Sequence, residues 1–534
     1  MAEARRITGP HLLLPTTGAA LELGPEQDPD AVAARVRLAA ERLGWPVHTA
    51  IRRHRGGSTL AMQAPPDVLY TACAVMEWAV AEDPEAAWAL VEEEHAEEAN
   101  PRLLALLEHA PGPSFSDDDY GFTLGLGRHS HTWPLDSLPE IGSLTPAAGI
   151  PFVFITGTNG KTTTTRMLTR IAMAAGHRPG WTSSDAYGVG ADIVEHGDWT
   201  GPGAARAVLR HPEVDFACLE TARGGLLRRG LVVGGADVAV VTNVSSDHLG
   251  EWGVYDVADM AEAKLGVVAG LAEGGILIAN AGNAVLRAAV PDALRKRPDV
   301  QVRWFADGPV EGVRLDATAT EDRLQLGDLH VPLATIPLTF GGTARHNVEN
   351  ALAAALAASA MGLTDAAIRD GLTELRPSVS ESRGRMNCFD LPNGARVVVD
   401  FAHNPEGIRQ VGRATAAWDA SRRFLLLGQA GDRTDEDLTE LAHQVAAMHP
   451  DGVILKEMHR YLRGRPEGEV IGILKQSLLA SGYPESRILT APTELDGARW
   501  MVDNARSGDL MLMLVQADLN GALSLLAQRG ATEV

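Results

Sequence analysis

Apolar and polar positions alternate most regularly in the middle of the chain, from about residue 151 onward. Short apolar runs with β-branched residues are separated there by helical segments, a pattern typical of parallel strands that are buried on both faces. The expected strands are Phe152–Thr156, Asp215–Leu219, Asp237–Thr242 and Gly275–Ala279. We therefore predict a central domain with a parallel sheet over residues 148–378.

The same alternation of strands and helices continues toward the C-terminus. The expected strands are Val397–Val399, Phe424–Leu427, Val453–Leu455 and Leu510–Val515. The expected helices are Pro405–Trp418, Glu436–Met448, Glu467–Leu479 and Glu494–Ala505. This order predicts a Rossmann-like, doubly wound domain over residues 379–534.

The first 147 residues have a mixed pattern. Apolar runs at His11–Leu14, Val47–Ile51 and Thr59–Met62 alternate with helical patterns at Ala31–Leu43 and Pro66–Ala81. We predict a small α+β domain over residues 1–147, so that the fold class is α/β with three domains. This domain either helps to shape the acceptor site or contacts another subunit, and formation of a homo-oligomer stays open.

Composition narrows the class of protein. The net charge of −22 comes from acidic residues spread over 534 positions, which argues against a nucleic acid as the main partner. Cys73, Cys218 and Cys388 are far apart and form no C-x-x-C motif, which favours a reducing compartment. The sequence has no apolar stretch typical of a signal peptide or a membrane span. We expect a cytoplasmic protein with no membrane partner.

Lysine is scarce, because only five of the 47 basic residues are lysines and 42 are arginines. An ammonium is a compact point charge that can lose its proton, whereas a guanidinium is a planar fork that stays charged. Lys161 lies inside the segment ITGTNGKTTTT over residues 155–165, and Lys264 follows the polar segment TNVSSDH over residues 242–248. The lysine distribution therefore points to a nucleotide site.

A glycine-rich loop follows the first strand of the central domain. Residues 155–165 read ITGTNGKTTTT, with the spacing G-x-x-G-K-T, two residues shorter than a standard Walker A loop. Backbone amides and the following helix would converge on phosphate oxygens, Lys161 would neutralise them, and the Thr162 hydroxyl would bind Mg²⁺. The predicted ATP-binding loop residues are Gly157, Thr158, Asn159, Gly160, Lys161, Thr162 and Thr163.

This short loop resembles that of the Mur ligase family, which joins a carboxylate to an amine with ATP. Further segments that resemble the family, in the same order, are Thr242–Leu249, Ala261–Lys264, Arg345–Ala351, Arg383–Arg385 and Asp400–Pro405. Within the family, the Mur-like half of the cyanophycin synthetases is the most similar group. The segments that carry this likeness are Thr182–Asp185, Leu219–Gly225, Gly431–Asp437 and Arg463–Glu469. The ATP-grasp domain of those enzymes has no counterpart here, so we expect one ligation rather than two.

The resemblance implies a catalytic and metal-binding set in the central domain. Glu220 follows a strand at its carboxyl end, where ligand sites lie in such sheets, and His248 follows the next strand. The predicted catalytic residues are Lys161, Glu220, His248 and Lys264, and the predicted Mg²⁺ ligands are Thr162, Glu220, His248 and a carbamylated Lys264. The alternatives are a structural carboxylate at Glu220 and an ordinary ion-paired lysine at position 264.

The resemblance also implies residues for the nucleotide and for the substrates. On the nucleotide side these are His346, Asn347 and Asn350 for adenine, Arg385 for phosphate and Asp400 for ribose. On the substrate side they are Thr182, Ser183, Ser184, Asp185, Arg223, His403, Asn404, Arg463 and Arg465. Helix capping by Asn347 or Asn404, and surface salt bridges for the arginines, remain alternatives.

The resulting hypothesis is an ATP- and Mg²⁺-dependent ligase that acts through an acyl phosphate. It would join an amino acid, with a basic one favoured, to a carboxylate-bearing substrate of aspartyl or glutamyl type. A folylpolyglutamate- or poly-γ-glutamate-type ligase is one alternative. A non-catalytic, regulatory nucleotide-binding protein is another, although nucleotide binding alone does not need Glu220, His248 and Lys264 together.

Overall fold

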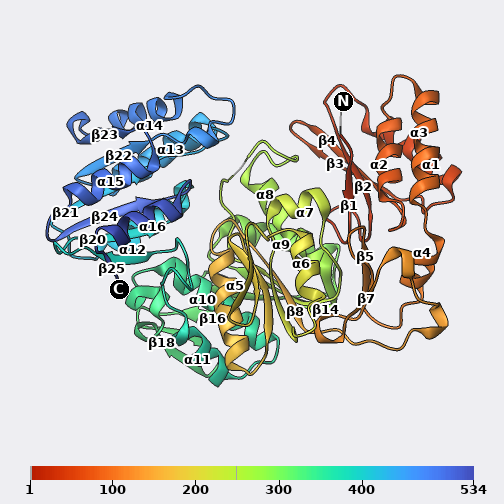
Figure 1. Ribbon diagram of the computed structural model, residues 1–534, viewed down its shortest axis with the longest axis horizontal. Coiled ribbons are helices and arrows are strands. Elements are labelled where there is room, and N and C mark those ends of the chain that lie inside the picture. The colour runs from red at the N-terminus through yellow and green to blue at the C-terminus, as the bar shows by residue number, and fades with distance from the viewer. Residues whose placement is uncertain (1–2, 248) are drawn as a thin grey trace. The chain divides into compact units, whose positions relative to one another are not determined.

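The structure is a computed structural model that describes residues 3–247 and 249–534, so the predicted ligand His248 lies outside the described residues. The chain divides into two compact units, which are described separately (Figure 1). The first comprises residues up to Thr320, together with Gln325–His330 and Glu349–Leu372. The second comprises Glu321–Leu324, Val331–Val348 and Thr373–Val534. The domain boundaries proposed from the sequence, near residues 147 and 378, stay predictions.

The N-terminal part of the first unit is built on an antiparallel sheet in the order β1-β2-β4-β3. Its strands are β1 (Arg5–Ile7), β2 (Gly18–Leu23), β3 (Thr49–His54) and β4 (Gly57–Gln63). This region also contains the helix α1 (Pro29–Leu43), between β2 and β3, and after β4 the helices α2 (Leu69–Trp78), α3 (Pro84–Glu98) and α4 (Pro101–Glu108). A second small sheet contains β5 (Ser114–Asp117), β6 (Gly121–Leu124) and β7 (His131–Trp133).

The apolar run at His11–Leu14 forms a turn rather than a strand, closed by a 2.8 Å hydrogen bond from the backbone N–H of His11 to the Leu14 carbonyl. The strand lies instead at Gly18–Leu23, whose Gly and Ala residues have low β propensity. Pairing with both β1 and β4 places that segment in the sheet interior, and this tertiary context overrides its local preference.

The central sheet of the first unit runs in the order β11-β10-β9-β12-β8-β13-β14-β15-β16. Its strands are β8 (Phe152–Thr156), β9 (Pro179–Thr182), β10 (Ala186–Val189), β11 (Asp192–His196), β12 (Phe216–Glu220), β13 (Ala236–Val241), β14 (Leu271–Asn280), β15 (Gln301–Ala306) and β16 (Ala317–Ala319). The strands from β9 to β16 in this order are parallel, and β10 and β11 are antiparallel additions. Every residue of β8 and β12 is buried, as the predicted two-sided packing requires.

Helices cover both faces of this sheet. On one face, apolar side chains of α6 (Pro202–Leu209), α7 (Arg223–Arg229), α8 (Val257–Leu265) and α9 (Ala284–Arg295) pack with Phe154, Leu219 and Val241. On the other face, the Cys218 thiol meets the Thr169 side chain of α5 (Lys161–Ala174). The chain continues through β17 (Arg323–Leu326), β18 (Leu329–Pro332), α10 (Arg345–Ala360) and α11 (Asp365–Glu374).

The second unit contains a doubly wound sheet in the order β23-β22-β21-β24-β20-β19-β25. Its strands are β19 (Asn387–Asp390), β20 (Arg396–Asp400), β21 (Arg422–Leu427), β22 (Gly452–Lys456), β23 (Ile488–Ala491), β24 (Asp509–Leu514) and β25 (Thr532–Glu533). Its helices are α12 (Pro405–Ala416), α13 (Asp435–Ala447), α14 (Glu469–Ala480), α15 (Glu494–Asn504) and α16 (Leu519–Gln528). Helices α12–α14 pack on one face of the sheet and α15–α16 on the other.

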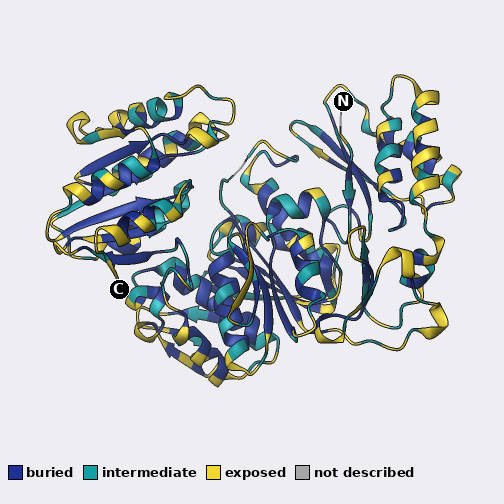
Figure 2. Cartoon of the chain, viewed as in Figure 1, coloured by how far each residue is buried: buried dark blue, intermediate teal, exposed yellow. Residues whose placement is uncertain are grey.

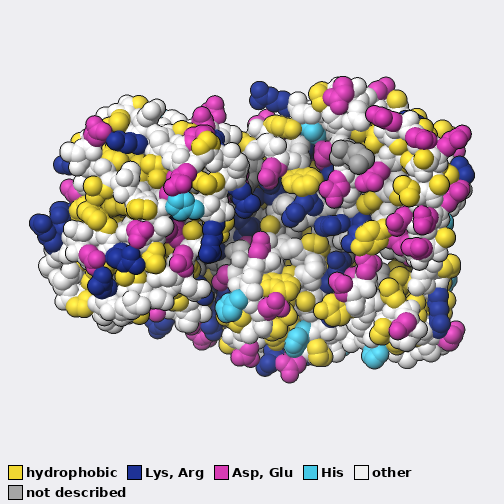
Figure 3. Space-filling model, turned by 45° about the horizontal axis from the view of Figure 1, so that its top comes forward, with side chains coloured by type: hydrophobic (Ala, Val, Ile, Leu, Met, Phe, Trp, Pro, Cys, Tyr) yellow, Lys and Arg dark blue, Asp and Glu magenta, His cyan; other side chains and the backbone are white. Residues whose placement is uncertain are grey.

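The α/β fold with parallel sheets is therefore confirmed, with antiparallel strands at the sheet edges. Figure 2 shows the strands as the buried layer, with exposed positions on the outer sides of the helices. Figure 3 shows acidic and basic side chains interspersed over the displayed face, in keeping with a net charge spread along the chain. None of the helices in the described part of the chain has the length and hydrophobicity that a membrane span requires.

Candidate active site

The glycine-rich loop joins β8 to α5 at the carboxyl edge of the central sheet. Gly160 precedes the helix with φ 82°, and Lys161 is the first helical residue. The Lys161 side chain folds back, and its Nζ donates to the Thr158 carbonyl oxygen over 3.0 Å. The amide groups of the first turn of α5 lack earlier carbonyls in the helix to pair with, which is the property that suits this position to phosphate oxygens.

Two residues after β13 hold the glycine-rich loop in shape. The backbone N–H of Asn159 donates to Asn243 Oδ1 over 2.9 Å, and Asn243 Nδ2 returns a 3.0 Å bond to the Asn159 carbonyl. Thr242 Oγ1 donates to the same carbonyl over 2.6 Å. Asn243 was not among the predicted site residues. The sequence signal that could have identified it is its position in a Thr-Asn pair directly after an apolar strand.

Both glycines of the loop lie so close to neighbouring side chains that no Cβ would fit. A Cβ on Gly157 would lie 1.8 Å from Thr242 Oγ1, and a Cβ on Gly160 would lie 2.0 Å from Asn350 Oδ1. Asn350, predicted on the adenine side, is buried on α10 and also lies 3.4 Å from Thr164 Oγ1. The structure therefore brings Asn350 against the loop itself.

The turn between β9 and β10 carries the four predicted acceptor-loop residues and lies beside the phosphate loop. Ser184 Oγ is 3.3 Å from Thr162 Oγ1, the hydroxyl predicted to bind Mg²⁺. Ser183 Oγ donates to Asp185 Oδ1 over 2.5 Å, and Arg166 of α5 pairs with Asp185 over 3.1 Å. Thr182 Oγ1 donates to the Glu220 carbonyl over 3.3 Å, which links this turn to the end of β12.

Glu220 and Arg223 lie at the next strand end. Glu220 is the last residue of β12, its side chain is buried, and Ile155 of β8 pairs beside it. Arg223 begins α7 and is also buried, and it forms an ion pair with Glu251 over 2.9 Å. The salt-bridge alternative for Arg223 is thus present in the structure, and its binding of a substrate carboxylate stays a prediction.

Lys264 is a buried lysine on α8, only 4% exposed, and its Nζ donates to the Gly157 carbonyl over 2.8 Å. Burial, and then the neighbouring charge of Lys161, lower the pKa of Lys264 well below its ordinary value, and Asp247 opposes the shift. A lysine with a depressed pKa has a neutral amine available at lower pH than an exposed lysine has. A neutral amine is the form that can react with carbon dioxide.

The predicted adenine-side residues His346 and Asn347 belong to the first turn of α10. Burial lowers the pKa of His346 to about 4, so its ring is neutral at neutral pH. Asn347 Nδ2 donates to the Leu338 carbonyl over 2.7 Å, and Asn347 is the third residue of the helix. The alternative in which Asn347 caps the helix is therefore wrong.

In the second unit, Asp400 ends β20 and organises the loop that follows. Its carboxylate accepts backbone N–H bonds from Met386 over 2.8 Å and from Ala402 over 2.7 Å. Burial raises the pKa of Asp400, while these two hydrogen bonds and the Arg385 charge act in the opposite direction. Arg385 thus lies within electrostatic reach of Asp400, as a shared nucleotide site would need.

His403 and Asn404 lie on that same loop. Asn404 Oδ1 accepts a 2.8 Å bond from the Gly407 backbone and caps α12, so the helix-start interpretation of Asn404 is correct. The His403 ring nitrogen Nδ1 lies 3.0 Å from the Phe401 carbonyl, and its own carbonyl accepts a hydrogen bond from Gln429. A role of either side chain in binding the amine stays a prediction.

Arg463 and Arg465 follow η7 (His459–Tyr461). Arg465 donates to the carbonyls of Gly431 over 2.9 Å and Arg433 over 2.7 Å, and it pairs with Asp435 and Glu469. Arg465 therefore fastens its own predicted substrate loop to the segment Gly431–Asp437. Arg463 has a positive φ of 49° and lies over the Tyr461 ring, with its guanidinium carbon 5.8 Å from the ring centroid.

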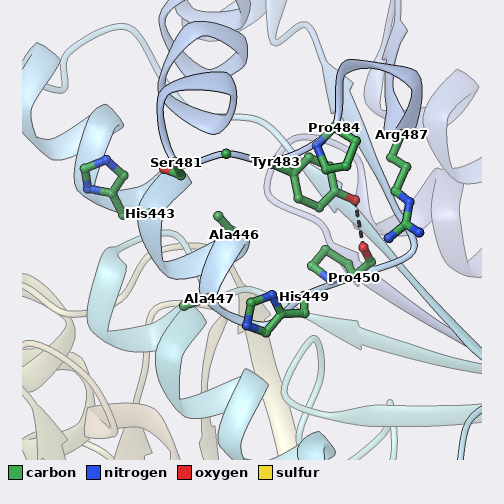
Figure 4. A pocket seen from close by; sticks show the side chains of 10 residues that line it. His443, Ala446, Ala447, His449, Pro450, Ser481, Tyr483, Pro484 and Arg487 are labelled. Atoms are coloured by element: carbon green, nitrogen blue, oxygen red, sulfur yellow. Dashed lines mark hydrogen bonds between the residues drawn. The ribbon is translucent and has the colours of Figure 1, made fainter.

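A pocket in the second unit lies at the opposite edge of its sheet (Figure 4). Its lining includes His449 and Pro450, which precede β22, and Arg487, which precedes β23. The Tyr483 hydroxyl donates to the Pro450 carbonyl over 2.8 Å within it. Asp400 lies at the carboxyl end of β20 and His403 follows it, so this pocket is separate from the predicted nucleotide residues.

Comparison with known families matches two successive parts of the chain. Residues 155–358 match the Mur ligase middle domain, and residues 384–514 match the glutamate ligase domain of Mur ligases. The chain carries the middle and C-terminal domains of the Mur ligase family. The resemblance drawn from the loop and the later segments is confirmed.

Curated relatives include cyanophycin synthetases. The one from Synechocystis sp. is 39% identical over 368 residues, which cover 66% of this chain and 41% of the relative. The chain thus spans less than half the length of the cyanophycin synthetases that it matches. A UDP-N-acetylmuramoyl-L-alanyl-D-glutamate–2,6-diaminopimelate ligase from Xanthomonas campestris is 30% identical over 300 residues, 54% of this chain and 58% of that protein.

Solved structures show the same fold. MurF from Acinetobacter baumannii aligns with a TM-score of 0.53 and 17% identity, over 71% of this chain and 76% of that one. E. coli FolC in complex with DHPP and ADP aligns with a TM-score of 0.52 and 20% identity, over 71% and 90% of the two chains. The match supports the α/β architecture described above.

Proposed function

We propose that this Mur ligase-family chain is an ATP- and Mg²⁺-dependent ligase that forms an amide bond between a carboxylate and an amine. The observation that carries the proposal is the convergence of three functional groups at one sheet edge. These groups are the Lys161 loop, the buried Glu220 carboxylate and the buried Lys264 amine. A loop that only bound nucleotide would not need a buried lysine with a lowered pKa directed at its backbone.

The residues fit a magnesium ion and a triphosphate. Mg²⁺ is usually held by one or two carboxylates together with phosphate oxygens and water, and Glu220 with the Thr162 hydroxyl supplies such a set. A carbamylated Lys264 would add a second carboxylate beside Gly157. The bound ion would neutralise charge on the phosphates. Glu220, Thr162 and Lys264 would hold it, and Lys161 would add its own positive charge.

The proposed reaction has two steps. An oxygen of the substrate carboxylate attacks the γ-phosphorus, and ADP leaves with an acyl phosphate formed. The amine then attacks the acyl carbon, loses a proton, and inorganic phosphate leaves. Catalysis of this kind depends on positioning and charge neutralisation. The hydrogen bonds around the glycine-rich loop would serve positioning, and Lys161 would supply the neutralising charge.

The substrate class is proposed from the relatives. Cyanophycin synthetases at 34–39% identity favour an aspartyl or glutamyl acyl substrate and a basic amino acid. The contact between Ser184 and Thr162 supports the β9–β10 turn as the acyl-binding loop, because it lies against the predicted phosphate and metal position. Asp400, Arg385, His403 and Asn404 are proposed for the nucleotide and the amine.

A ligase of folylpolyglutamate or poly-γ-glutamate type is the second candidate. FolC shares the fold at 20% identity, which does not extend to its substrate. The cyanophycin synthetases are nearly twice as similar in sequence, so the basic amino acid is preferred over glutamate as the incoming amine.

The experiment is a phosphate-release assay with ATP, Mg²⁺ and pools of amino acids and acidic peptides, followed by mass spectrometry of the products. We expect release that requires both an acid and an amine, and a product whose mass equals their sum less one water. Release without either partner, or nucleotide binding with no turnover in any pool, would reject ligation and support a regulatory nucleotide-binding protein.

A further inference from the structure

Helix α8, which carries Lys264, is held from outside by the N-terminal part of the first unit. Arg52 of β3 is only 8% exposed as a side chain and directs all its nitrogens at this region. Its Nε donates to Glu262 over 2.7 Å, its Nη2 to Asp259 over 3.0 Å, and its Nη1 to the Gly253 carbonyl over 2.6 Å. One guanidinium thus fixes the helix and the loop before it.

The two contacts of α8 lie on different sides of the helix. Successive residues of an α-helix are rotated by about 100°, so Glu262 and Lys264 point roughly 200° apart. Glu262 faces Arg52 on one side, and Lys264 reaches the Gly157 carbonyl on the other. The helix is therefore held between the N-terminal sheet and the phosphate loop.

The last residue of β3, His54, contacts the segment that leads into α8. The His54 ring stacks on Tyr255 with centroids 5.6 Å apart. The Tyr255 backbone N–H donates to Asp259 over 2.8 Å, and Asp256 caps the helix. A Cβ on Gly253 would lie 2.6 Å from Arg52 Nη1, so the loop packs closely on the guanidinium.

We propose that Arg52 is a positioning residue, which holds α8 in the place where the Lys264 amine meets the glycine-rich loop. The proposal rests on the function proposed above for Lys264. It also assigns a task to the N-terminal region, which supplies a structural part of the ligation site. The guanidinium of Arg52 donates to three acceptors from Nε, Nη1 and Nη2, which a lysine cannot reproduce.

The neighbouring arginine provides a matched control. The Arg53 side chain is 64% exposed and pairs with Asp30 of the N-terminal region. The substitution Arg53→Ala therefore removes a positive charge from the same strand as Arg52→Ala but leaves the contacts to α8 in place. For Arg52→Ala we expect kcat to fall about tenfold or more, since a displacement of about 1 Å at a reacting group can lower rates on the order of 100-fold. The KM for ATP should change by less than about threefold, because the glycine-rich loop has its own bonds to Asn243.

Rescue and a direct readout complete the test. Millimolar guanidinium should restore part of the kcat of Arg52→Ala and leave Arg53→Ala unchanged. Hydrogen–deuterium exchange gives a readout that needs no ligation assay. Amide exchange over α8 (Val257–Leu265) should become faster in Arg52→Ala, because the helix and the loop before it lose three contacts, and should stay at the parent level in Arg53→Ala.

The outcomes separate the two proposals. Unchanged α8 exchange and kcat in Arg52→Ala, or an equal loss in Arg53→Ala, would overturn the positioning role. Absence of ligation by the parent protein, with α8 exchange that still depends on Arg52, would overturn the proposed function alone. If Arg52→Ala fails to fold by circular dichroism, Glu262→Gln and Arg52→Lys decide, with an expected loss of several-fold in kcat.

Discussion

The Nζ of Lys264 donates to the carbonyl oxygen of Gly157 across 2.8 Å, joining residues 107 positions apart in the sequence. This bond ties the end of α8 to the first glycine of the phosphate loop. Displacement of α8 would therefore move the amine away from the loop, and loss of the lysine removes both the amine and the hydrogen bond.

Replacement of the lysine is the most direct test of its chemistry. Lys264→Ala should reduce kcat by a factor on the order of 100 or more, as expected for loss of a group that stabilises developing charge. Short-chain carboxylic acids should restore part of the activity, because they can occupy the space of a carbamate. Rates would be compared with and without added acetate or propionate. Full activity without any acid would remove the carbamate from the mechanism.

The depressed pKa of Lys264 predicts a dependence on bicarbonate and pH. Carbamylation needs the neutral amine, whose fraction rises as pH increases through the lowered pKa. Activity of carbon dioxide-depleted enzyme should therefore recover on addition of bicarbonate, and faster at pH 8 than at pH 6. A ¹³C-bicarbonate NMR signal that is absent in Lys264→Ala would identify the carbamate. Equal recovery at both pH values would contradict the proposed titration.

The same pKa shift has a consequence for stability. In the unfolded chain Lys264 stays protonated up to about pH 10.4. In the folded protein it loses that proton at a lower pH, because its pKa is lowered. The unfolded state thus binds more protons between the two pKa values, so this group makes the free energy of unfolding rise with pH in that window. Urea denaturation at pH 7 and pH 9 should show a smaller rise in Lys264→Met than in the parent.

Lys161→Ala should abolish turnover with the fold intact, because the loop would lose its charge toward the phosphates. We expect kcat to fall by about 100-fold to 1,000-fold, with a matching loss of ATP affinity in calorimetry. Lys475→Ala is the control, since that lysine is partly exposed and pairs with Glu485. Near-normal ligation by Lys161→Ala would contradict its role.

Gly160→Ala is expected to destabilise the protein in two ways, through backbone strain and through a steric clash. Gly176→Ala introduces the strain alone and so separates the two effects. At φ 82°, a non-glycine residue costs about 1–2 kcal/mol, and its Cβ would also meet Asn350 Oδ1 at 2.0 Å. Gly176 has a similar φ of 88° but open space around it. Gly160→Ala should therefore lower the melting temperature more than Gly176→Ala and should alone weaken ATP binding. Equal effects on both measurements would mean that the contact with Asn350 is unimportant.

A buried ion pair in the second unit is expected to dominate its stability. Lys456 is fully buried and pairs with Glu494, which also accepts backbone bonds from Gln516 over 2.9 Å and Asp518 over 2.6 Å. Lys456→Ala leaves that carboxylate uncompensated and should lower the free energy of unfolding by about 3–5 kcal/mol. Chemical denaturation measures this free energy. The control Lys475→Ala, which breaks a partly exposed ion pair, should change the free energy of unfolding by less than about 1 kcal/mol. A similar loss in both variants would contradict the argument.

Strands and helices of the two parallel-sheet regions could be predicted from the sequence because their signals are local. The strand at Phe152–Thr156 was predicted at its observed bounds, and the helix expected at Glu494–Ala505 ends one residue earlier than predicted. Both-face burial produces continuous apolar runs, which are visible without tertiary information. The N-terminal sheet was harder to predict, because β2 is a strand only through its two neighbours.

The residues of the candidate site also fall into those that the sequence predicts and those that only the fold reveals. Lys161, the loop glycines and the residue after a buried strand, Glu220, follow from spacing and from the rule that ligand sites lie at carboxyl ends of parallel strands. The resemblance to Mur ligases added Lys264, whose burial and bond to Gly157 only the fold shows. Asn243 and Arg52 were missed, because their importance lies in which distant backbone or carboxylate they contact.

The sequence by itself determined the α/β class, the phosphate loop and the family, since each depends on neighbouring residues or on a short motif. Tertiary structure alone decided that the Lys264 amine is desolvated beside Gly157 and that an arginine from the N-terminal sheet holds its helix. The physical reason is that desolvation and hydrogen bonding depend on what surrounds a group in space. Chain segments separated by 100 residues or more supply those surroundings here.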